Sequence, residues 1–328
     1  MPESGRSPEP PRPDERFAET APRAGRRAPG GEWVGRRLGK YDLVGLLGAG
    51  GMGVVYEAQD TVLNRRVALK LLPPALAESD RQALRRFLRE AQAAARLNHP
   101  NVVAIYDVVP DGEVNYLVME LARRGSAQDY LRRRGRLPWP KATRIVADLC
   151  RGLAAAHEQG LVHRDVKPAN VMRSADRVVK LADFGLAKPV GGEASLTGSG
   201  IVGTPDYMSP EQCRGEPLDA RTDLYALGAT YYALLVGRPP YPRGVPVQTM
   251  FAHCSSPVPD PRAAVPEVPP AVVAVIQKAM AKRPGERYQS AAEMLADLKL
   301  IDAGVGDADI SFPDLPARPM PPPRCSPT

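Results

Sequence analysis

The sequence predicts an α+β fold with two lobes: a small antiparallel β-rich N-lobe with one main helix, and a larger helical C-lobe. Two observations support this prediction. Short β-branched and aromatic runs, separated by turn residues, dominate the chain from Tyr41 to Val118. After about residue 140, apolar residues instead recur with the 3.6-residue period of amphipathic helices. The 328 residues, 43% of them hydrophobic, suffice for one large or two modest domains.

The N-lobe is expected to contain a small sheet. Its strands are predicted at residues 43–47, 54–56, 66–71, 102–109 and 114–119. The last two flank Pro110-Asp111-Gly112, a sequence typical of a hairpin turn. One helix interrupts the strands, because Ser79 and Gln82 have the spacing of a capping box and apolar residues follow at helical spacing up to Ala95.

The C-lobe is expected to be mainly helical. One apolar stripe covers residues 145–156, and a second covers 224–235. A last helix is predicted to open with a capping box formed by Ser290 and Glu293. Because ligands prefer clefts between such units, the boundary between the two lobes is the expected binding site.

Both ends of the chain differ in composition from the middle. Of the 36 prolines, seven lie in residues 1–40 and seven in 303–328. Such segments bury too little apolar surface to offset backbone entropy, so we expect a disordered leader and a disordered tail. The folded domain is then 41–302, with its N-lobe at about 41–120 and its C-lobe at about 121–302. The proline runs would suit either polyproline II ligands of a partner or plain linkers.

The net charge of +7 does not indicate nucleic-acid binding. Residues 41–302 contain 33 basic and 28 acidic residues, an excess of only five. Six arginines cluster after the sheet, where they would suit either an acidic partner or a solvated helix face. They are Arg123, Arg124, Arg132, Arg133, Arg134 and Arg136.

The sequence predicts a cytoplasmic protein with no membrane span. No run approaches the ~18–20 apolar residues that cross a bilayer. The N-terminus lacks the apolar core of a secretory signal. The four cysteines are far apart and form neither a disulfide framework nor a zinc pattern.

A glycine-rich motif, Gly48-Ala49-Gly50-Gly51-Met52-Gly53, matches G-x-G-x-x-G. A dinucleotide-binding site would need a helix to start within it, whereas residues 54–58 continue as a strand. The chain also lacks the G-x-x-x-x-G-K-[ST] motif of a P-loop enzyme. The motif therefore favours a hairpin whose backbone N–H groups approach phosphates closely, because no Cβ intervenes.

Lys70 lies within the apolar strand predicted at residues 66–71. Burying its ammonium is costly unless it meets an anion. Glu90 lies near the apolar stripe of the following helix, where a surface carboxylate would be out of place. We expect an internal ion pair between Lys70 and Glu90, which either serves structure alone or directs the lysine to phosphate oxygens.

Three further motifs follow in order: His163-Arg164-Asp165-Val166-Lys167-Pro168-Ala169-Asn170, Asp183-Phe184-Gly185 and Ser209-Pro210-Glu211. With the glycine hairpin, the strand lysine and the helix glutamate, this set resembles the bacterial eukaryotic-like (Hanks-type) serine/threonine protein kinases over about 80% of the chain. The resemblance implies a two-lobed protein kinase-like fold. It also implies transfer of the ATP γ-phosphate to Ser or Thr hydroxyls of proteins.

Phosphoryl transfer in this family depends on positioning and charge neutralisation. The resemblance assigns Asp165 to accept and orient the substrate hydroxyl, and Lys167 to neutralise charge on the transferred group. Lys70 completes the catalytic set. Asn170 and Asp183 would hold Mg²⁺, with Mn²⁺ as an alternative, because hard oxygen ligands and phosphates suit these ions.

The resemblance also implies how ATP is held. Met119 would be the gatekeeper, and Glu120 and Ala122 would present hinge backbone to adenine. Residues 123–130 lack the glycine and leucine pattern usual after the hinge, so no ribose contact is assigned. The expected ATP-binding residues are Leu47, Gly48, Gly50, Gly53, Val55, Ala68, Lys70, Glu90, Met119, Glu120, Ala122, Asn170 and Asp183.

Other residues match the family's supporting positions. Asp223 would brace the catalytic loop, and Glu211 and Arg287 would form a buried ion pair. His163 is expected to be a hydrogen-bonding core residue and not a base. Thr204, in Gly203-Thr204-Pro205, would support the acceptor site.

The segment between the D-F-G and P-E motifs would be the activation loop. Arg164 is expected to bind a phosphorylated residue there through charge-assisted hydrogen bonds. The candidate phosphosites are Ser195, Thr197 and Ser199, with autophosphorylation at Thr197 or Ser199 as the hypothesis. Relatives often pair through the N-lobe, which leaves a homodimer open.

Three other functions fit the sequence less well. A pseudokinase scaffold would have lost catalytic groups, but all of the expected ones are present. A small-molecule phosphotransferase can share the fold, but Lys167, Thr204 and the P-E motif favour a protein acceptor. An adaptor acting through the proline-rich ends would not explain the motifs between them. ATP and proteins with Ser or Thr acceptors are therefore the expected partners.

Overall fold

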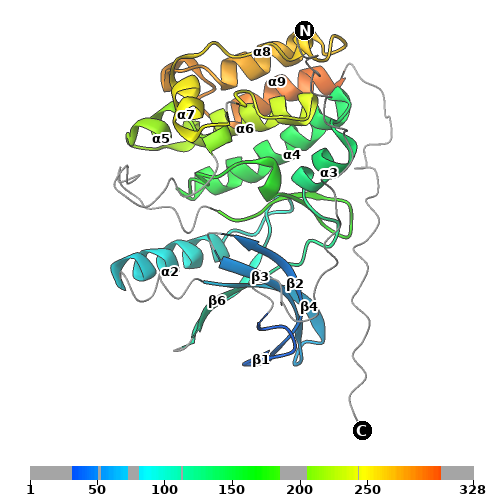
Figure 1. Cartoon of the computed structure of the whole chain (residues 1–328), viewed down its shortest axis with the longest axis vertical. Helices are drawn as coiled ribbons and strands as arrows, with labels where there is room; N and C mark the ends of the chain where they lie inside the picture. Colours follow the sequence, from blue (N-terminus) through cyan, green and yellow to red (C-terminus); the bar gives the residue numbers. More distant parts are fainter. Residues whose placement is uncertain are drawn as a thin grey trace, which may run out of the picture.

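The computed structural model describes residues 32–50, 53–72, 81–111, 114–184, 205–242 and 244–303. These residues form two lobes, one built on a curled antiparallel sheet and the other on helices (Figure 1). The predicted α+β fold is therefore confirmed. The six-stranded sheet has the order β1-β2-β3-β4-β6-β5. Its strands are β1 Arg37–Leu38, β2 Tyr41–Gly50, β3 Gly53–Asp60, β4 Arg65–Leu71, β5 Ile105–Asp111 and β6 Val114–Met119.

The alternation of side chains along β4 explains where Lys70 points. Val67, Leu69 and Leu71 pack with the tyrosines of β2 and β3 on one face of the sheet. Ala68 belongs to the other cluster, which lies towards α2 (Arg81–Ala95) and the C-lobe. Because successive strand residues face opposite sides, Lys70 shares the face of Ala68. The alternation of side chains along β4 therefore places Lys70 on the face of the sheet that lies towards the cleft between the lobes.

Two predicted boundaries in the N-lobe were wrong, and one predicted helix cap lies outside the described residues. The folded domain begins before residue 41, because β1 pairs with β2 and Trp33 packs against the sheet. The strand predicted at 102–109 begins only at Ile105. Of the predicted capping box, Ser79 lies outside the described residues, as does the side chain of Gln82.

The C-lobe is helical, as predicted. Its helices are α3 Ala127–Arg134, α4 Trp139–Glu158, α5 Pro210–Arg214, α6 Ala220–Val236, α7 Pro246–Ser255, α8 Pro270–Ala279 and α9 Ala291–Ala303. Short 3-10 turns occur at η1 Pro168–Asn170, η2 Pro205–Tyr207, η3 Pro261–Ala263 and η4 Pro284–Glu286, and the two-stranded sheet is β7 Val171–Arg173 with β8 Val179–Leu181. The core centres on α4 and α6, which Figure 1 shows in the middle of this lobe.

Helix ends follow local capping rules. The predicted capping box of α9 is half formed: Ser290 Oγ accepts from the Glu293 N–H at 3.1 Å, but the Glu293 carboxylate accepts from the Gln289 N–H instead. A complete box occurs at α3, where Ser126 and Asp129 satisfy each other's backbone N–H groups. This box contributes to holding α3 at the edge of the cleft.

The chain leaves α2 and docks on the C-lobe before it returns to the sheet. The Leu181 N–H donates to the Asn101 carbonyl at 2.9 Å, and the Val103 N–H donates to the Leu181 carbonyl at 2.9 Å. Asn101 Nδ2 donates to the Val179 carbonyl at 2.9 Å. Gly152 of α4 lies beneath this segment, where a Cβ would stand 2.8 Å from the Asn101 carbonyl oxygen. The absence of a side chain at Gly152 therefore permits the lobes to meet.

We expect Gly152→Ala to lower the free energy of unfolding by about 1–2 kcal/mol, although alanine is the better helix former. The added methyl has to displace backbone, which outweighs the gain in helix propensity. Urea unfolding followed by circular dichroism measures this change. Gly45→Ala is the control, because a Cβ at Gly45 meets nothing within 4 Å. A destabilisation by Gly152→Ala no larger than that of the control would contradict the close approach.

Candidate active site

The loop between α4 and β7 is held by one buried carboxylate. Asp223, in the first turn of α6, is fully buried. Its Oδ2 accepts from the His163 N–H at 2.7 Å and from His157 Nε2 at 2.8 Å, and its Oδ1 accepts from the Arg164 N–H at 2.7 Å. These bonds hold Arg164 at a φ of +64°, an uncommon conformation for a residue with a side chain. The sequence-based role of Asp223 as a brace is thus matched by its contacts.

His163 serves as a fixed hydrogen-bonding group. Its Nδ1 accepts from the Asp165 N–H at 3.2 Å, so Nε2 carries the proton and donates to the Ala182 carbonyl at 2.9 Å. Burial lowers the pKa of His163, so the ring is neutral near pH 7. Because both nitrogens are engaged, His163 is not available as a base, in agreement with the expectation from the sequence.

Asp165 lies between a cation and an amide. Lys167 Nζ lies 2.7 Å from Asp165 Oδ2, and Asn170 Nδ2 donates to the same oxygen at 3.0 Å and to the Asp165 carbonyl at 2.8 Å. The Asp165 side chain is 9% exposed and that of Lys167 is 31% exposed. The three predicted residues therefore meet, with the lysine at the solvent side.

Asp183 follows β8 and faces the sheet of the other lobe. Lys70 Nζ lies 2.9 Å from Asp183 Oδ1, and the lysine side chain is only 7% exposed. Asp183 adopts a φ of +58°, a second left-handed residue at this site. Phe184 packs against the His163 ring with centroids 4.6 Å apart, which fixes the backbone after Asp183. A buried cation and a strained carboxylate in one cleft are typical of a functional site.

The predicted direct ion pair between Lys70 and Glu90 was wrong. Lys70 pairs with Asp183, while Glu90 Oε1 lies 3.3 Å from Arg164 Nη1. The sequence places several carboxylates near the cleft, and the lysine meets the one that β8 presents. Glu90 is drawn instead to the guanidinium of Arg164, which offers several donors. The expectation that Lys70 meets an anion is nevertheless confirmed.

A cavity of about 800 Å³ lies between the lobes, beside these residues. Nine of the expected ATP-binding residues line it: Leu47, Gly48, Val55, Ala68, Met119, Glu120, Ala122, Asn170 and Asp183. Of the other expected residues, Gly53, Lys70 and Glu90 do not line it, although Lys70 contacts Asp183, which does. Gly50 and Gly53 pair across the hairpin whose tip lies outside the described residues.

Part of the cavity wall was not predicted from the sequence. Val103, Leu121, Met172 and Ala182 line it with apolar side chains. These residues lie in apolar runs of the sequence, and such runs do not distinguish residues that line a cavity from residues of the core. Four arginines also line the cavity, namely Arg66, Arg123, Arg124 and Arg133.

Asn170 and Asp183 fit the requirements of a magnesium ion. The Asn170 hydrogen bonds described above use its amide nitrogen, so the amide oxygen is left to act as a ligand. The Ala182 N–H donates to the Asn170 carbonyl at 2.8 Å, which ties the two ligand-bearing segments together. Within the described ranges, no group of three or more His, Cys, Asp or Glu residues could hold a metal. Two oxygen donors completed by phosphates and water are the usual Mg²⁺ arrangement.

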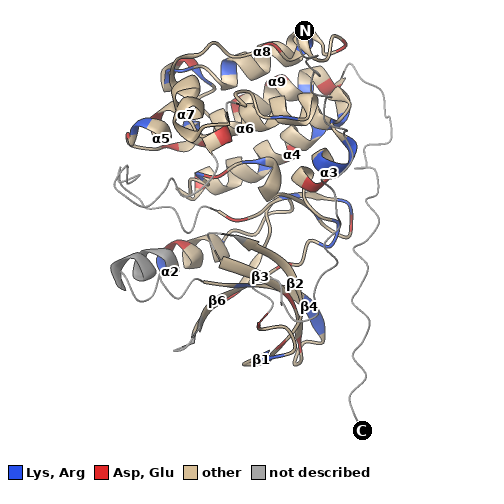
Figure 2. Cartoon of the chain, viewed as in Figure 1, with Lys and Arg blue, Asp and Glu red and all other residues tan. Residues whose placement is uncertain are grey.

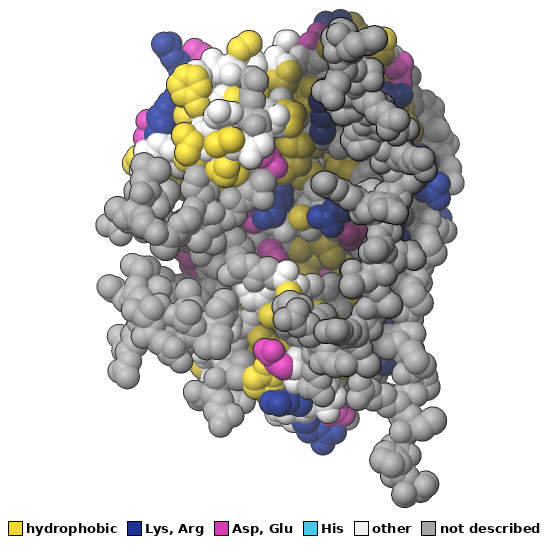
Figure 3. Space-filling view, in the orientation of Figure 1, with side chains coloured by type: hydrophobic (Ala, Val, Ile, Leu, Met, Phe, Trp, Pro, Cys, Tyr) yellow, Lys and Arg dark blue, Asp and Glu magenta, His cyan; other side chains and the backbone are white. Residues whose placement is uncertain are grey.

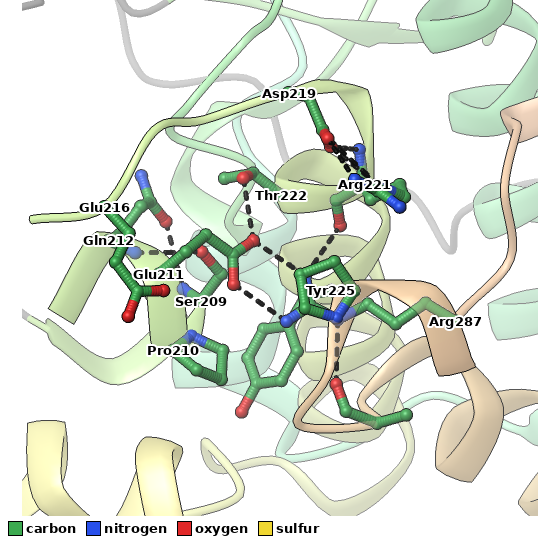
Figure 4. Close-up of polar contacts among 12 residues, drawn as sticks. Ser209, Pro210, Glu211, Gln212, Glu216, Asp219, Arg221, Thr222, Tyr225 and Arg287 are labelled. Carbon is green, nitrogen blue, oxygen red and sulfur yellow. Dashed lines mark hydrogen bonds and ion pairs between the residues drawn. The ribbon is translucent and has the colours of Figure 1, made fainter. Parts of the chain in front are cut away.

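A buried ion pair supports the far side of the site. Glu211 and Arg287 form two hydrogen bonds of 2.7 and 2.8 Å, and Thr222 Oγ1 donates to Glu211 Oε1 at 2.8 Å (Figure 4). Gln212, next to Glu211, donates to the Arg164 carbonyl at 2.9 Å. The predicted pair is therefore present, and its helix α5 contacts the catalytic loop directly. The expected residues Ser195, Thr197, Ser199 and Thr204 lie outside the described residues.

Comparison with known proteins agrees with this geometry. The protein kinase domain family matches residues 41–298. The chain belongs to this family. The Mycolicibacterium smegmatis serine/threonine-protein kinase PknB is 43% identical to the kinase domain over 272 residues, which cover 81% of this chain and 43% of that protein. A probable serine/threonine-protein kinase of Corynebacterium efficiens is 39% identical over 301 residues, 88% of this chain and 46% of that protein.

A solved structure supports the fold. The crystal structure of a mutant of the Mycobacterium tuberculosis PknI kinase domain superposes with a TM-score of 0.66 and 32% identity, covering 81% of this chain and 97% of that one. The chain spans less than half the length of the curated relatives it matches. Among the described helices, none has the length and apolar character needed to cross a membrane.

Proposed function

We propose that this chain transfers the γ-phosphate of ATP to Ser or Thr hydroxyls of protein substrates. The observation that carries the proposal is the position of Asp165, held by Lys167 and by Asn170, which lines the cavity together with Asp183. The likeness to bacterial serine/threonine-protein kinases supports it.

The charge and position of each residue determine its role in the proposed transfer. Asp165 accepts a hydrogen bond from the substrate hydroxyl and orients its oxygen towards the phosphoryl group. Lys167, which already contacts the Asp165 carboxylate, neutralises charge that develops on the transferred group. Lys70 lies where it can exchange its contact with Asp183 for phosphate oxygens.

Met119, Glu120 and Ala122 line the other end of the cavity, where the adenine base would lie against hinge backbone. Asn170 and Asp183 would hold Mg²⁺, which lowers the electrostatic cost of bringing nucleophile and phosphates together. Mn²⁺ shares the preference for oxygen ligands and would serve as a substitute.

We expect Lys70→Met to lower kcat/KM for ATP by about 10- to 100-fold, the worth of a charge-assisted hydrogen bond. Methionine keeps the length of the side chain within the apolar strand, so the fold is retained. Steady-state kinetics with varied ATP measures the effect. Lys299→Met is the control, because Lys299 is exposed on α9, away from the cavity. If Lys70→Met and wild type had the same kcat/KM for ATP, Lys70 would not contact the phosphates as proposed.

Phosphate transfer from labelled ATP to casein, an unstructured protein with many serines and threonines, tests the proposed activity. Wild type is expected to label casein and itself, whereas a protein that only hydrolyses ATP would release inorganic phosphate. A pseudokinase would give neither product.

Autophosphorylation in the activation loop remains part of the proposal. Ser195, Thr197 and Ser199 are the candidate sites, and Arg164 would bind the resulting phosphate in place of Glu90. Phosphopeptide mapping of wild type and Asp165→Asn checks this expectation. Absence of loop phosphate from an active wild-type enzyme would overturn it.

A further inference from the structure

Three arginines form a rim on the cavity next to the hinge. Arg123 and Arg124 follow the hinge directly, and Arg133 lies on α3. We call these three residues the arginine rim. Figure 2 shows the basic segment of α3 close to the junction of the lobes, and Figure 3 shows Lys and Arg side chains between the lobes on the same face. Arg123 and Arg133 are exposed to solvent.

Each acidic side chain among the described residues that line the cavity has a partner other than Arg123 or Arg133. Glu57 pairs with Arg66 at 3.4 Å, and Glu120 with Lys180 at 3.0 Å. The remaining two are Asp183, which pairs with Lys70, and Asp129, which caps α3 through Ser126 and pairs with Arg132 at 3.8 Å.

Within the part of the chain that the structure describes, no carboxylate pairs with Arg123 or Arg133. Two exposed guanidinium groups therefore leave positive charge at the mouth of the site. A plain solvated helix face would not place arginines on a cavity wall together with Asn170 and Asp183. Arg134, on the same helix, is exposed and does not line the cavity, so it represents that solvated face.

The nucleotide does not account for the rim. ATP placed with its base at the hinge and its phosphates at Asp183 presents the uncharged ribose to the segment after the hinge. The phosphate charges lie at the far end of the cavity, beside Lys70. Among the described residues, no group supplies an anion to Arg123 or Arg133. The protein substrate is a second molecule that enters the same cleft and can supply one.

We infer that the preferred substrates contain acidic side chains within a few residues of the acceptor hydroxyl, and that the arginine rim binds them. This inference rests on the proposed function and narrows its substrate class. Arginine suits the role because its planar guanidinium binds carboxylates with two parallel hydrogen bonds. Attraction of this kind selects substrates by complementary charge and also repels basic ones.

Three synthetic peptides test the inference. They share one acceptor serine and differ only in their flanking residues, which are Glu, Gln or Lys. Wild type is expected to phosphorylate the Glu peptide with a kcat/KM about tenfold above that of the Gln peptide, as two or three exposed charge-assisted contacts would give. The Lys peptide is expected to be the poorest, and the preference for Glu is expected to shrink as salt is raised.

Charge reversal at the rim gives the sharper comparison. Arg123→Glu with Arg133→Glu is expected to invert the order, so that the Lys peptide becomes the best of the three. Arg134→Glu makes the same charge change on the same helix outside the cavity, and it is expected to keep the wild-type order. Circular dichroism establishes that each variant is folded.

Four results would overturn the inference. The first two are equal kcat/KM values of wild type for the three peptides and an unchanged order of peptides in the double variant. The third is inversion of that order by Arg134→Glu. The fourth is a double variant whose only change is in KM for ATP, by the same factor with every peptide. The last result would assign the rim to the nucleotide. Failure of wild type to phosphorylate any peptide or casein would instead refute the proposed function, and the inference with it.

Discussion

Replacing Asp165 by asparagine is expected to lower kcat for phosphate transfer by about 10²–10⁴-fold, the usual contribution of a positioned acid or base. Asparagine keeps the size of the side chain and an oxygen that can accept from Asn170 or Lys167. It cannot take up the proton of the substrate hydroxyl. Because Asp165 does not line the nucleotide cavity, KM for ATP is expected to change little. Initial rates with varied ATP and saturating peptide measure both constants.

The control for this variant makes the same chemical change elsewhere in the lobe. Asp176 lies exposed in the turn between β7 and β8, so Asp176→Asn is expected to match wild type. Thermal unfolding of both variants checks that folding is unaffected. A loss of less than tenfold in kcat for Asp165→Asn would exclude Asp165 as the group that accepts the proton.

Removing Glu211 is expected to cause the largest loss of stability. Arg287 is fully buried, and Glu211→Ala leaves its charge without a counterion in the core of the C-lobe. Breaking a buried pair in this way typically costs about 3–5 kcal/mol. The arginine would keep its bonds to the carbonyls of Ala281, Arg221 and Lys282, which satisfy three of its five N–H donors and do not compensate its charge. Urea unfolding at pH 7 measures the change in free energy.

An exposed pair supplies the matched control. Arg136 and Glu267 lie 3.3 Å apart with side chains that are 47% and 59% exposed, so Glu267→Ala is expected to cost about 0–1 kcal/mol. Similar losses for Glu211→Ala and Glu267→Ala would contradict the central role of the buried pair.

The pH dependence of stability gives a second test of the pair. Burial acts to raise the pKa of Glu211, but the hydrogen bonds and charge of Arg287 outweigh it and hold the pKa below its ordinary value of 4.5. The stabilisation is therefore complete above pH 4.5 and is lost as the pH falls through the lower pKa of the folded state. Glu211→Gln lacks this titration, so its stability is expected to fall less steeply below pH 4.5. If the free energy of unfolding of wild type and of Glu211→Gln fell equally steeply below pH 4.5, the lowered pKa of Glu211 would be contradicted.

Much of the fold followed from the sequence because strands and helices have different periods. The short apolar run of β4 and the helical stripe of α4 are strong local signals, and both elements lie where they were expected. Residues 102 and 103 are apolar like a strand, but they bind to Leu181 of the other lobe. A local pattern does not indicate which partner an extended segment will take.

The site was predicted less evenly. Asp165, Asn170 and Asp183 lie within motifs whose spacing fixes their neighbours. Glu90 was assigned to Lys70 because both are charged residues in apolar surroundings, but the structure pairs it with Arg164. The choice among several oppositely charged groups in one cleft depends on tertiary placement, which no spacing encodes. The arginine cluster was visible in the sequence, whereas its division into rim and solvated face was not.

The amino acid that receives phosphate from ATP decides whether the protein is a serine/threonine kinase. Wild-type protein, γ-labelled ATP, Mg²⁺ and casein are incubated, and the labelled casein is hydrolysed to its phosphoamino acids. We expect phosphoserine or phosphothreonine, formed by wild type and lost in Asp165→Asn. Label in phosphotyrosine alone, label only in inorganic phosphate, or equal labelling by Asp165→Asn would contradict the proposed activity.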